Sequence, residues 1–142
     1  MGVEGWHWND AWIFVSAVIA ERLERDRAQH AALPTTGATL ADVLAAADFL
    51  HHCVPSRAEL QDAIRKLVGA GLLTVSDDLV EVAPAGEQLW RNRPFSGLSS
   101  AVVTLQSQLN KASVPGDVDW RLDELTYNAA VREYSIRLAD GR

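Results

Sequence analysis

The side chains best suited to chemistry lie in one short segment, His51-His52-Cys53, followed by Ser56. Imidazole and thiolate groups bind zinc, and a cysteine or serine beside a histidine can act as a nucleophile. Neighbouring residues at a helix end point about 100° apart, so the first three side chains do not converge on one ion. The paired ligand spacing of zinc sites is also missing from the sequence. We therefore interpret the segment as a turn between two helices, with Cys53 as small buried filler and Ser56 as a helix cap.

Other catalytic signatures are missing as well. The sequence has no glycine-rich phosphate loop and no H-E-x-x-H, and no third group is positioned to orient a nucleophile–base pair. The acidic pairs Asp77/Asp78 and Asp123/Glu124 lie in polar, exposed-looking stretches. We predict a protein that is not an enzyme and needs no metal or cofactor. The single cysteine rules out an internal disulfide and agrees with a cytoplasmic protein.

Composition predicts one globular domain. The chain has 142 residues, of which 48% are hydrophobic and 23% charged. Its 13 basic and 19 acidic residues give a net charge of −6, which excludes nucleic-acid binding through bulk positive charge. The apolar run from Ala11 to Ala20 is too short to span a bilayer and has no Lys or Arg before it, so we expect a buried helix and no membrane contact.

The periodicity of apolar residues and the capping signals predict a mainly helical chain with one hairpin. Thr39 with Asp42 and Ser56 with Glu59 have the spacing of capping boxes. We expect an N-terminal packing and dimerisation helix within 1–34, a core over 35–92, and C-terminal helices within 93–142. The expected helices are 9–29, one after Thr39, one from Ser56 to Gly69, Ala85–Arg91, 98–112 and 118–139, with strands Leu72–Val75 and Leu79–Val82 and a linker over 30–38.

Part of this pattern resembles the winged helix-turn-helix regulators of bacteria. The amphipathic helix 59–68 ends at Gly69 and Gly71, continues into the hairpin, and is followed by the sequence Pro-Ala-Gly-Glu at 84–87. The resemblance covers 35–92 and identifies no particular family within the superfamily. It implies a winged helix-turn-helix core flanked by an N-terminal helix and two C-terminal helices.

The resemblance also implies a DNA-reading helix, because the third helix of such proteins lies in the major groove. On this sequence its outward positions would be Arg57, Gln61, Arg65 and Lys66. Arg57 and Gln61 can read guanine and adenine edges, while Arg65 and Lys66 can contact phosphates. The same four residues also fit the solvated face of an ordinary amphipathic helix.

The hairpin tip departs from the expected pattern. A wing that approaches phosphates normally offers Lys or Arg, whereas this tip offers Asp77 and Asp78. Like charges repel within about 10 Å at ordinary salt. We therefore expect the wing to stay away from DNA.

The aromatic and apolar residues near the two chain ends suggest a subunit interface. We predict a homodimer formed by the N-terminal helix and the C-terminal helices; core packing is the alternative role for its residues. The predicted interface residues are Trp8, Trp12, Phe14, Val18, Trp120, Tyr127 and Tyr134.

Two functions follow from these observations. The first, which the resemblance makes the leading interpretation, is a DNA-binding, transcriptional-regulator-like protein that reads double-stranded DNA with the helix at about 56–69. The second is a winged-helix module that binds another protein and no DNA. Residues 35–92 favour the second, because their 4 basic and 8 acidic side chains sum to −4.

Overall fold

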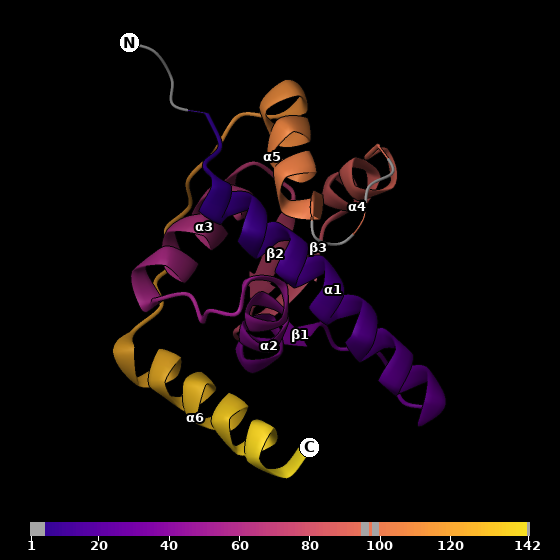
Figure 1. The fold of residues 1–142 in the computed structure, drawn as a ribbon, viewed down its shortest axis with the longest axis vertical. Coiled ribbons are helices and arrows are strands. Elements are labelled where there is room, and N and C mark those ends of the chain that lie inside the picture. Colours follow the sequence, from indigo (N-terminus) through magenta and orange to yellow (C-terminus); the bar gives the residue numbers. More distant parts are fainter. Residues whose placement is uncertain (1–4, 95–96, 98–99, 142) are drawn as a thin grey trace.

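A computed structural model describes residues 5–94, 97 and 100–141. In this part of the chain, six helices surround a three-stranded antiparallel sheet, so the predicted mainly helical class is confirmed (Figure 1). No helix among these residues is long and apolar enough to cross a membrane. The elements are α1 (Trp8–His30), β1 (Ala38–Thr39), α2 (Leu40–His51), α3 (Arg57–Gly69), β2 (Leu73–Ser76), β3 (Leu79–Val82), α4 (Pro84–Arg91), α5 (Ala101–Ala112) and α6 (Glu124–Gly141).

The first half of α1 is the centre of the hydrophobic core. All residues from 10 to 18 are buried, including Ile13, Phe14 and Val15, which are fully enclosed. α1 packs against α2, α3, α5 and the sheet, and it crosses the middle of the molecule in Figure 1. Burial of each large apolar side chain contributes about 1.5–3 kcal/mol. The helix predicted at 9–29 is therefore confirmed, and it is enclosed by elements of its own chain.

Reciprocal hydrogen bonds fix the starts of α2 and α3. Thr39 accepts the Asp42 amide at 3.1 Å, and Asp42 accepts the Thr39 amide at 2.9 Å. Ser56 and Glu59 make the same exchange at the start of α3, at 3.1 and 2.9 Å. Both capping boxes are confirmed, and they set where the chain enters each helix.

The sheet has the order β1-β3-β2. The hairpin of β2 and β3 is confirmed, and its two-residue turn places Asp77 and Asp78 at φ 53° and 60°. A tight hairpin turn requires positive φ at both positions, and aspartate tolerates that conformation. The sequence analysis treated 30–38 as a linker and missed β1, where Ala38 pairs with Val80. A two-residue strand has too little sequence for an alternating pattern.

The C-terminal elements begin later than predicted. α6 starts at Glu124 instead of 118, because the Asp123 side chain accepts the Thr126 amide at 2.7 Å and caps the helix there. The chain before it, residues 113–123, is neither helix nor strand. α5 spans Ala101–Ala112, and the first residues of its predicted range, 98–99, lie outside the described residues.

A buried carboxylate connects α1 to the sheet. Glu21 accepts the Val82 amide at 3.1 Å and a hydrogen bond from Arg25 at 3.0 Å. Burial raises the pKa of Glu21, and the contacts with Val82 and Arg25 oppose that rise without cancelling it. Ionised Glu21 therefore supplies an acceptor that β3 needs at some cost in desolvation.

Replacing Glu21 with alanine should lower the free energy of unfolding by about 1–3 kcal/mol, because the Val82 N–H loses its acceptor. Glu21→Gln keeps a carbonyl acceptor and removes the buried charge, so it should lose less. Because the pKa of Glu21 is raised in the folded state, the wild type gains stability as the pH falls through that pKa. The free energy of unfolding of the wild type should therefore rise relative to that of Glu21→Gln when the pH is lowered. Urea unfolding at pH 7 and 5 measures both effects. Equal stabilities of the two variants would contradict the role assigned to the Val82 contact.

Candidate functional site

The irregular segment 113–123, which we call the strap, runs over the polar face of α3. The Arg57 guanidinium donates to the Leu122 carbonyl at 3.0 Å, and the Leu122 amide donates to the Gln61 side chain at 2.8 Å. Arg65 donates to both carboxylate oxygens of Asp117, at 2.9 and 3.2 Å. This side-chain hydrogen bond raises the pKa of Arg65 and lowers that of Asp117. The outward polar groups of α3 are thus bonded to the chain itself.

Close backbone packing holds the strap against the end of α3. The Gly116 amide donates to the Lys66 carbonyl at 3.2 Å. A Cβ on Gly69 would lie 2.1 Å from the Asp117 nitrogen, so only glycine fits there. Leu122 is 1% exposed and belongs to the hydrophobic core. The strap is therefore an integral part of the fold.

The fourth predicted DNA contact, Lys66, faces α1. Its ammonium lies 3.3 Å from both oxygens of Asp10, which is buried and also accepts the His7 amide. Arg57, Gln61, Arg65 and Lys66 thus share one helix as predicted, and each has a partner within the chain. Their role in DNA binding stays a prediction. The acidic hairpin tip, Asp77 and Asp78, is exposed.

The cluster at His51–Cys53 forms no metal site. The His51 ring packs against Trp8 and Trp12, with ring centroids 4.6 and 5.3 Å apart, and His52 ends α2 in a left-handed conformation. Cys53 is exposed, so its interpretation as buried filler was wrong: it follows the helix end in an exposed turn. Within the described residues, no group of three or more His, Cys, Asp or Glu side chains could hold a metal ion.

The residues predicted to form a dimer interface pack inside the chain. Trp12, Phe14, Val18 and Tyr134 are buried, and Trp8, Trp120 and Tyr127 are half-buried against the core. They hold elements of one chain together, and a role of the three half-buried residues in a dimer interface stays a prediction.

Two tyrosine hydroxyls anchor α6. Tyr134 donates to Asp48 on α2 at 2.5 Å, and burial together with that carboxylate raises the pKa of Tyr134 to about 12. Tyr127 donates to the Pro55 carbonyl at 2.7 Å. The aromatic face of α6 is therefore its inner face.

The opposite face of α6 carries four exposed apolar residues and one arginine, which together we call the outer stripe. Leu125 is 83% exposed and Ile136 is 54% exposed. Helical spacing aligns them with three further exposed residues. The outer stripe consists of Leu125, Ala129, Arg132, Ile136 and Ala139. The sequence analysis took the aromatic face as the interface and missed this second apolar face.

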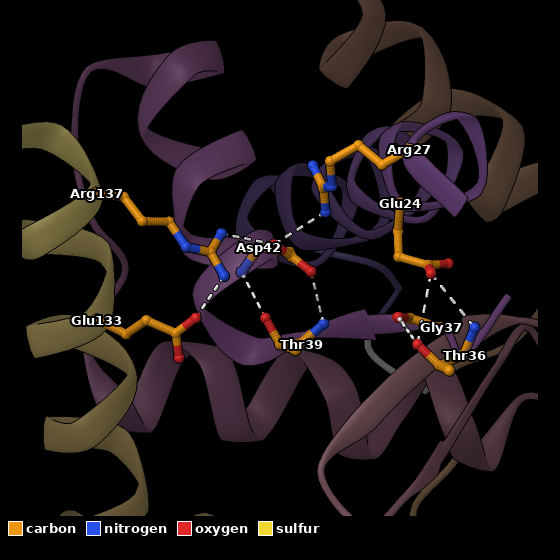
Figure 2. Close-up of polar contacts among 8 residues, drawn as sticks. All are labelled: Glu24, Arg27, Thr36, Gly37, Thr39, Asp42, Glu133 and Arg137. Atoms are coloured by element: carbon orange, nitrogen blue, oxygen red, sulfur yellow. Dashed lines mark hydrogen bonds and ion pairs between the residues drawn. The ribbon is translucent and has the colours of Figure 1, made fainter. Parts of the chain in front are cut away.

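A second polar site joins α1, α2 and α6 around the buried carboxylate of Asp42 (Figure 2). One oxygen accepts the Thr39 amide, and the other accepts from Arg137 at 2.6 Å and lies 3.5 Å from Arg27. Arg137 also donates to Glu133 at 2.5 Å. Burial opposes ionisation of Asp42, but the hydrogen bonds from Arg137 and Thr39 outweigh it and lower the pKa. The contact between Asp42 and Arg137 joins residues 95 positions apart, which no local signal predicts.

An apolar cleft of about 410 Å³ lies beside this cluster. Its walls come from α1 and α2, and the charged residues of the cluster line part of it. The lining residues are Ile19, Ala20, Leu23, Arg27, Asp42, Ala45, Ala46, Phe49 and Arg137. A concave, mostly apolar surface with a few charged groups is a typical binding site for a small molecule.

No known family model, curated protein or solved structure matches the chain. The candidate sites are therefore defined by residue geometry.

Replacing Gly69 with alanine should displace the strap. Alanine favours helix by about 1 kcal/mol, but a Cβ 2.1 Å from backbone forces a shift that typically costs about 1–3 kcal/mol. We expect a lower melting temperature and faster proteolysis within 113–123. Gly97→Ala is the matched control, because nothing lies within 4 Å of a Cβ at that position. Equal protease sensitivity of the two variants would contradict the close packing of strap and helix.

Proposed function

We propose that the chain is a winged-helix protein-interaction module that does not read DNA with α3. The element order α1-β1-α2-α3-β2-β3, with β1 beside β3, supports the winged-helix assignment because it contains the expected helix, turn, helix and hairpin. The observation that carries the functional proposal is the strap: Arg57, Gln61 and Arg65 all bond to it.

The energy needed to free α3 argues against DNA reading. Exposing Leu122 would cost about 2 kcal/mol, and its two backbone hydrogen bonds with α3 add about 1 kcal/mol each. A total of about 4 kcal/mol would weaken DNA binding roughly a thousandfold. The strap and the wing also add carboxylates, including Asp117, Asp119 and Asp78, which repel phosphates.

The outer stripe of α6 is the surface that best fits a protein partner. Leu125, Ala129 and Ile136 form an exposed apolar line along a helix whose other face is already packed. Exposed apolar side chains grouped on one helix face mark candidate interaction sites, although Arg132 interrupts this line. The simplest partner is a second copy of the chain, with the outer stripes of two α6 helices packed on each other.

This assembly predicts a dimer at tens of micromolar protein. The double variant Leu125→Glu plus Ile136→Glu should be monomeric, because burying two charges per chain opposes association. A matched control, Asn128→Glu plus Ser135→Glu, adds the same charge to exposed positions of α6 beside the outer stripe. It should dimerise like the wild type. Light scattering coupled to gel filtration measures the mass, and a monomeric wild type at 100 µM or so would rule out self-association.

DNA recognition is the second candidate function, favoured by the side-chain chemistry of α3. This hypothesis predicts that DNA binding appears when the strap is displaced from α3. We expect no binding of wild-type protein to duplex DNA at about 50 mM salt, measured by fluorescence anisotropy with random duplexes and with DNA upstream of its own gene. Wild-type binding that falls steeply with salt would refute the proposal. Binding by Gly69→Ala, but not by wild type or Gly97→Ala, would instead assign DNA reading to a form with the strap open.

A further inference from the structure

The apolar cleft between α1 and α2 is open at its mouth and closed at its base. Ala20 and Ala46 are buried, whereas Leu23 and Phe49 are exposed, the latter at 65%. A solvent-exposed phenyl ring beside a cavity leaves apolar surface in water that a ligand could cover. The volume of about 410 Å³ is within the range of small-molecule sites.

The two arginines at one end of the cleft differ in how strongly they are paired with carboxylates. Arg137 makes short contacts with two carboxylates, Asp42 at 2.6 Å and Glu133 at 2.5 Å. Arg27 lies 3.5 Å from the Asp42 oxygen that Arg137 already holds, and its side chain is 61% exposed. In the part of the chain that the structure describes, this weak ion pair is the one polar contact we find for the Arg27 guanidinium. Figure 2 shows Arg27 and Arg137 reaching Asp42 from opposite sides.

We propose that the cleft binds a small molecule with an apolar body and a single carboxylate, the carboxylate pairing with Arg27. Arg137 is paired with both Asp42 and Glu133, so Arg27, with its longer 3.5 Å ion pair to Asp42, is the lining cation with the weaker pairing. Guanidinium and carboxylate match in shape and form two parallel hydrogen bonds. The apolar body then covers Leu23 and Phe49. A dianion would lack a second unsaturated cation, and a cationic ligand would meet two arginines.

Asp42 favours this selectivity by staying ionised. Its hydrogen bonds with Arg137 and Thr39 overcome the effect of burial and lower its pKa, so Asp42 keeps Arg137 paired through the neutral range and Arg27 stays the more weakly paired cation. The cleft shares no residue with the outer stripe of α6 or with the strap. Ligand binding is therefore independent of the proposed function, and either can fail without the other.

Octanoate is a suitable probe because it combines an alkyl chain with one carboxylate. Isothermal titration calorimetry on the full chain should detect its binding, and 1-octanol, which has no charge, should bind at least tenfold more weakly. Acetate, which has no apolar body, should not bind measurably. Two-dimensional NMR of the labelled protein should place the octanoate-induced shifts on α1 and α2.

Single substitutions separate the contribution of the charge to ligand binding from that of the apolar wall. Arg27→Gln should weaken octanoate binding about tenfold or more and leave octanol binding unchanged. Arg25→Gln is the matched control: it removes the same charge two residues away, at a position that does not line the cleft, and should bind octanoate like the wild type. Phe49→Ser should weaken both ligands, and because Phe49 is mostly exposed this variant should keep its fold.

Absence of octanoate binding at millimolar concentration would overturn the proposal. So would octanol binding as tightly as octanoate, or equal affinities of Arg27→Gln and Arg25→Gln for octanoate. Melting curves of all three variants confirm that losses of binding come from folded protein.

Discussion

The complete burial of the first half of α1 is the constraint on which the other elements depend. A helix that is apolar on several sides needs neighbours on each of them. α2, α3, α5 and the sheet supply those neighbours. The polar residues that this arrangement brings inside are each paired, with Asp10 facing Lys66 and Glu21 facing Val82. The central helix thus determines where buried charges are tolerated as well as where the core lies.

The C-terminal third of the chain closes the two surfaces that this packing leaves open. The strap covers α3, and α6 covers α2. Both closures rely on hydrogen bonds between side chains and the backbone: the Leu122 amide donates to Gln61, and the Tyr127 hydroxyl donates to the Pro55 carbonyl. A buried backbone group costs more when left without a partner than its hydrogen bond contributes in net stability. This asymmetry makes the strap hard to remove once Leu122 is in the core.

Local signals in the sequence were sufficient for the helix starts. Thr39 and Ser56 were recognised because a capping box depends on residues three positions apart. The Asp123 cap has the same local character, but the apolar periodicity of Trp120 led the sequence analysis to begin α6 too early. Contacts across the fold left no such trace: Asp42 with Arg137 and Arg65 with Asp117 pair residues from distant parts of the chain. The polar face of α3 was predicted correctly, but the strap that covers it lies far along the chain and could not be predicted from local sequence.

The arginines of this protein share one chemistry and differ in how strongly each guanidinium is already paired within the chain. Arg57 and Arg65 have the chemistry to contact DNA, yet the strap already supplies the acceptors that a base or phosphate would offer. Arg27 has the same guanidinium but only a long contact with a carboxylate oxygen that another arginine occupies. A ligand at Arg27 gains a charge-assisted hydrogen bond without first breaking a strong one. A ligand at α3 must replace contacts worth several kilocalories before it gains any, and this difference is the physical reason for proposing the cleft, and not α3, as a binding site.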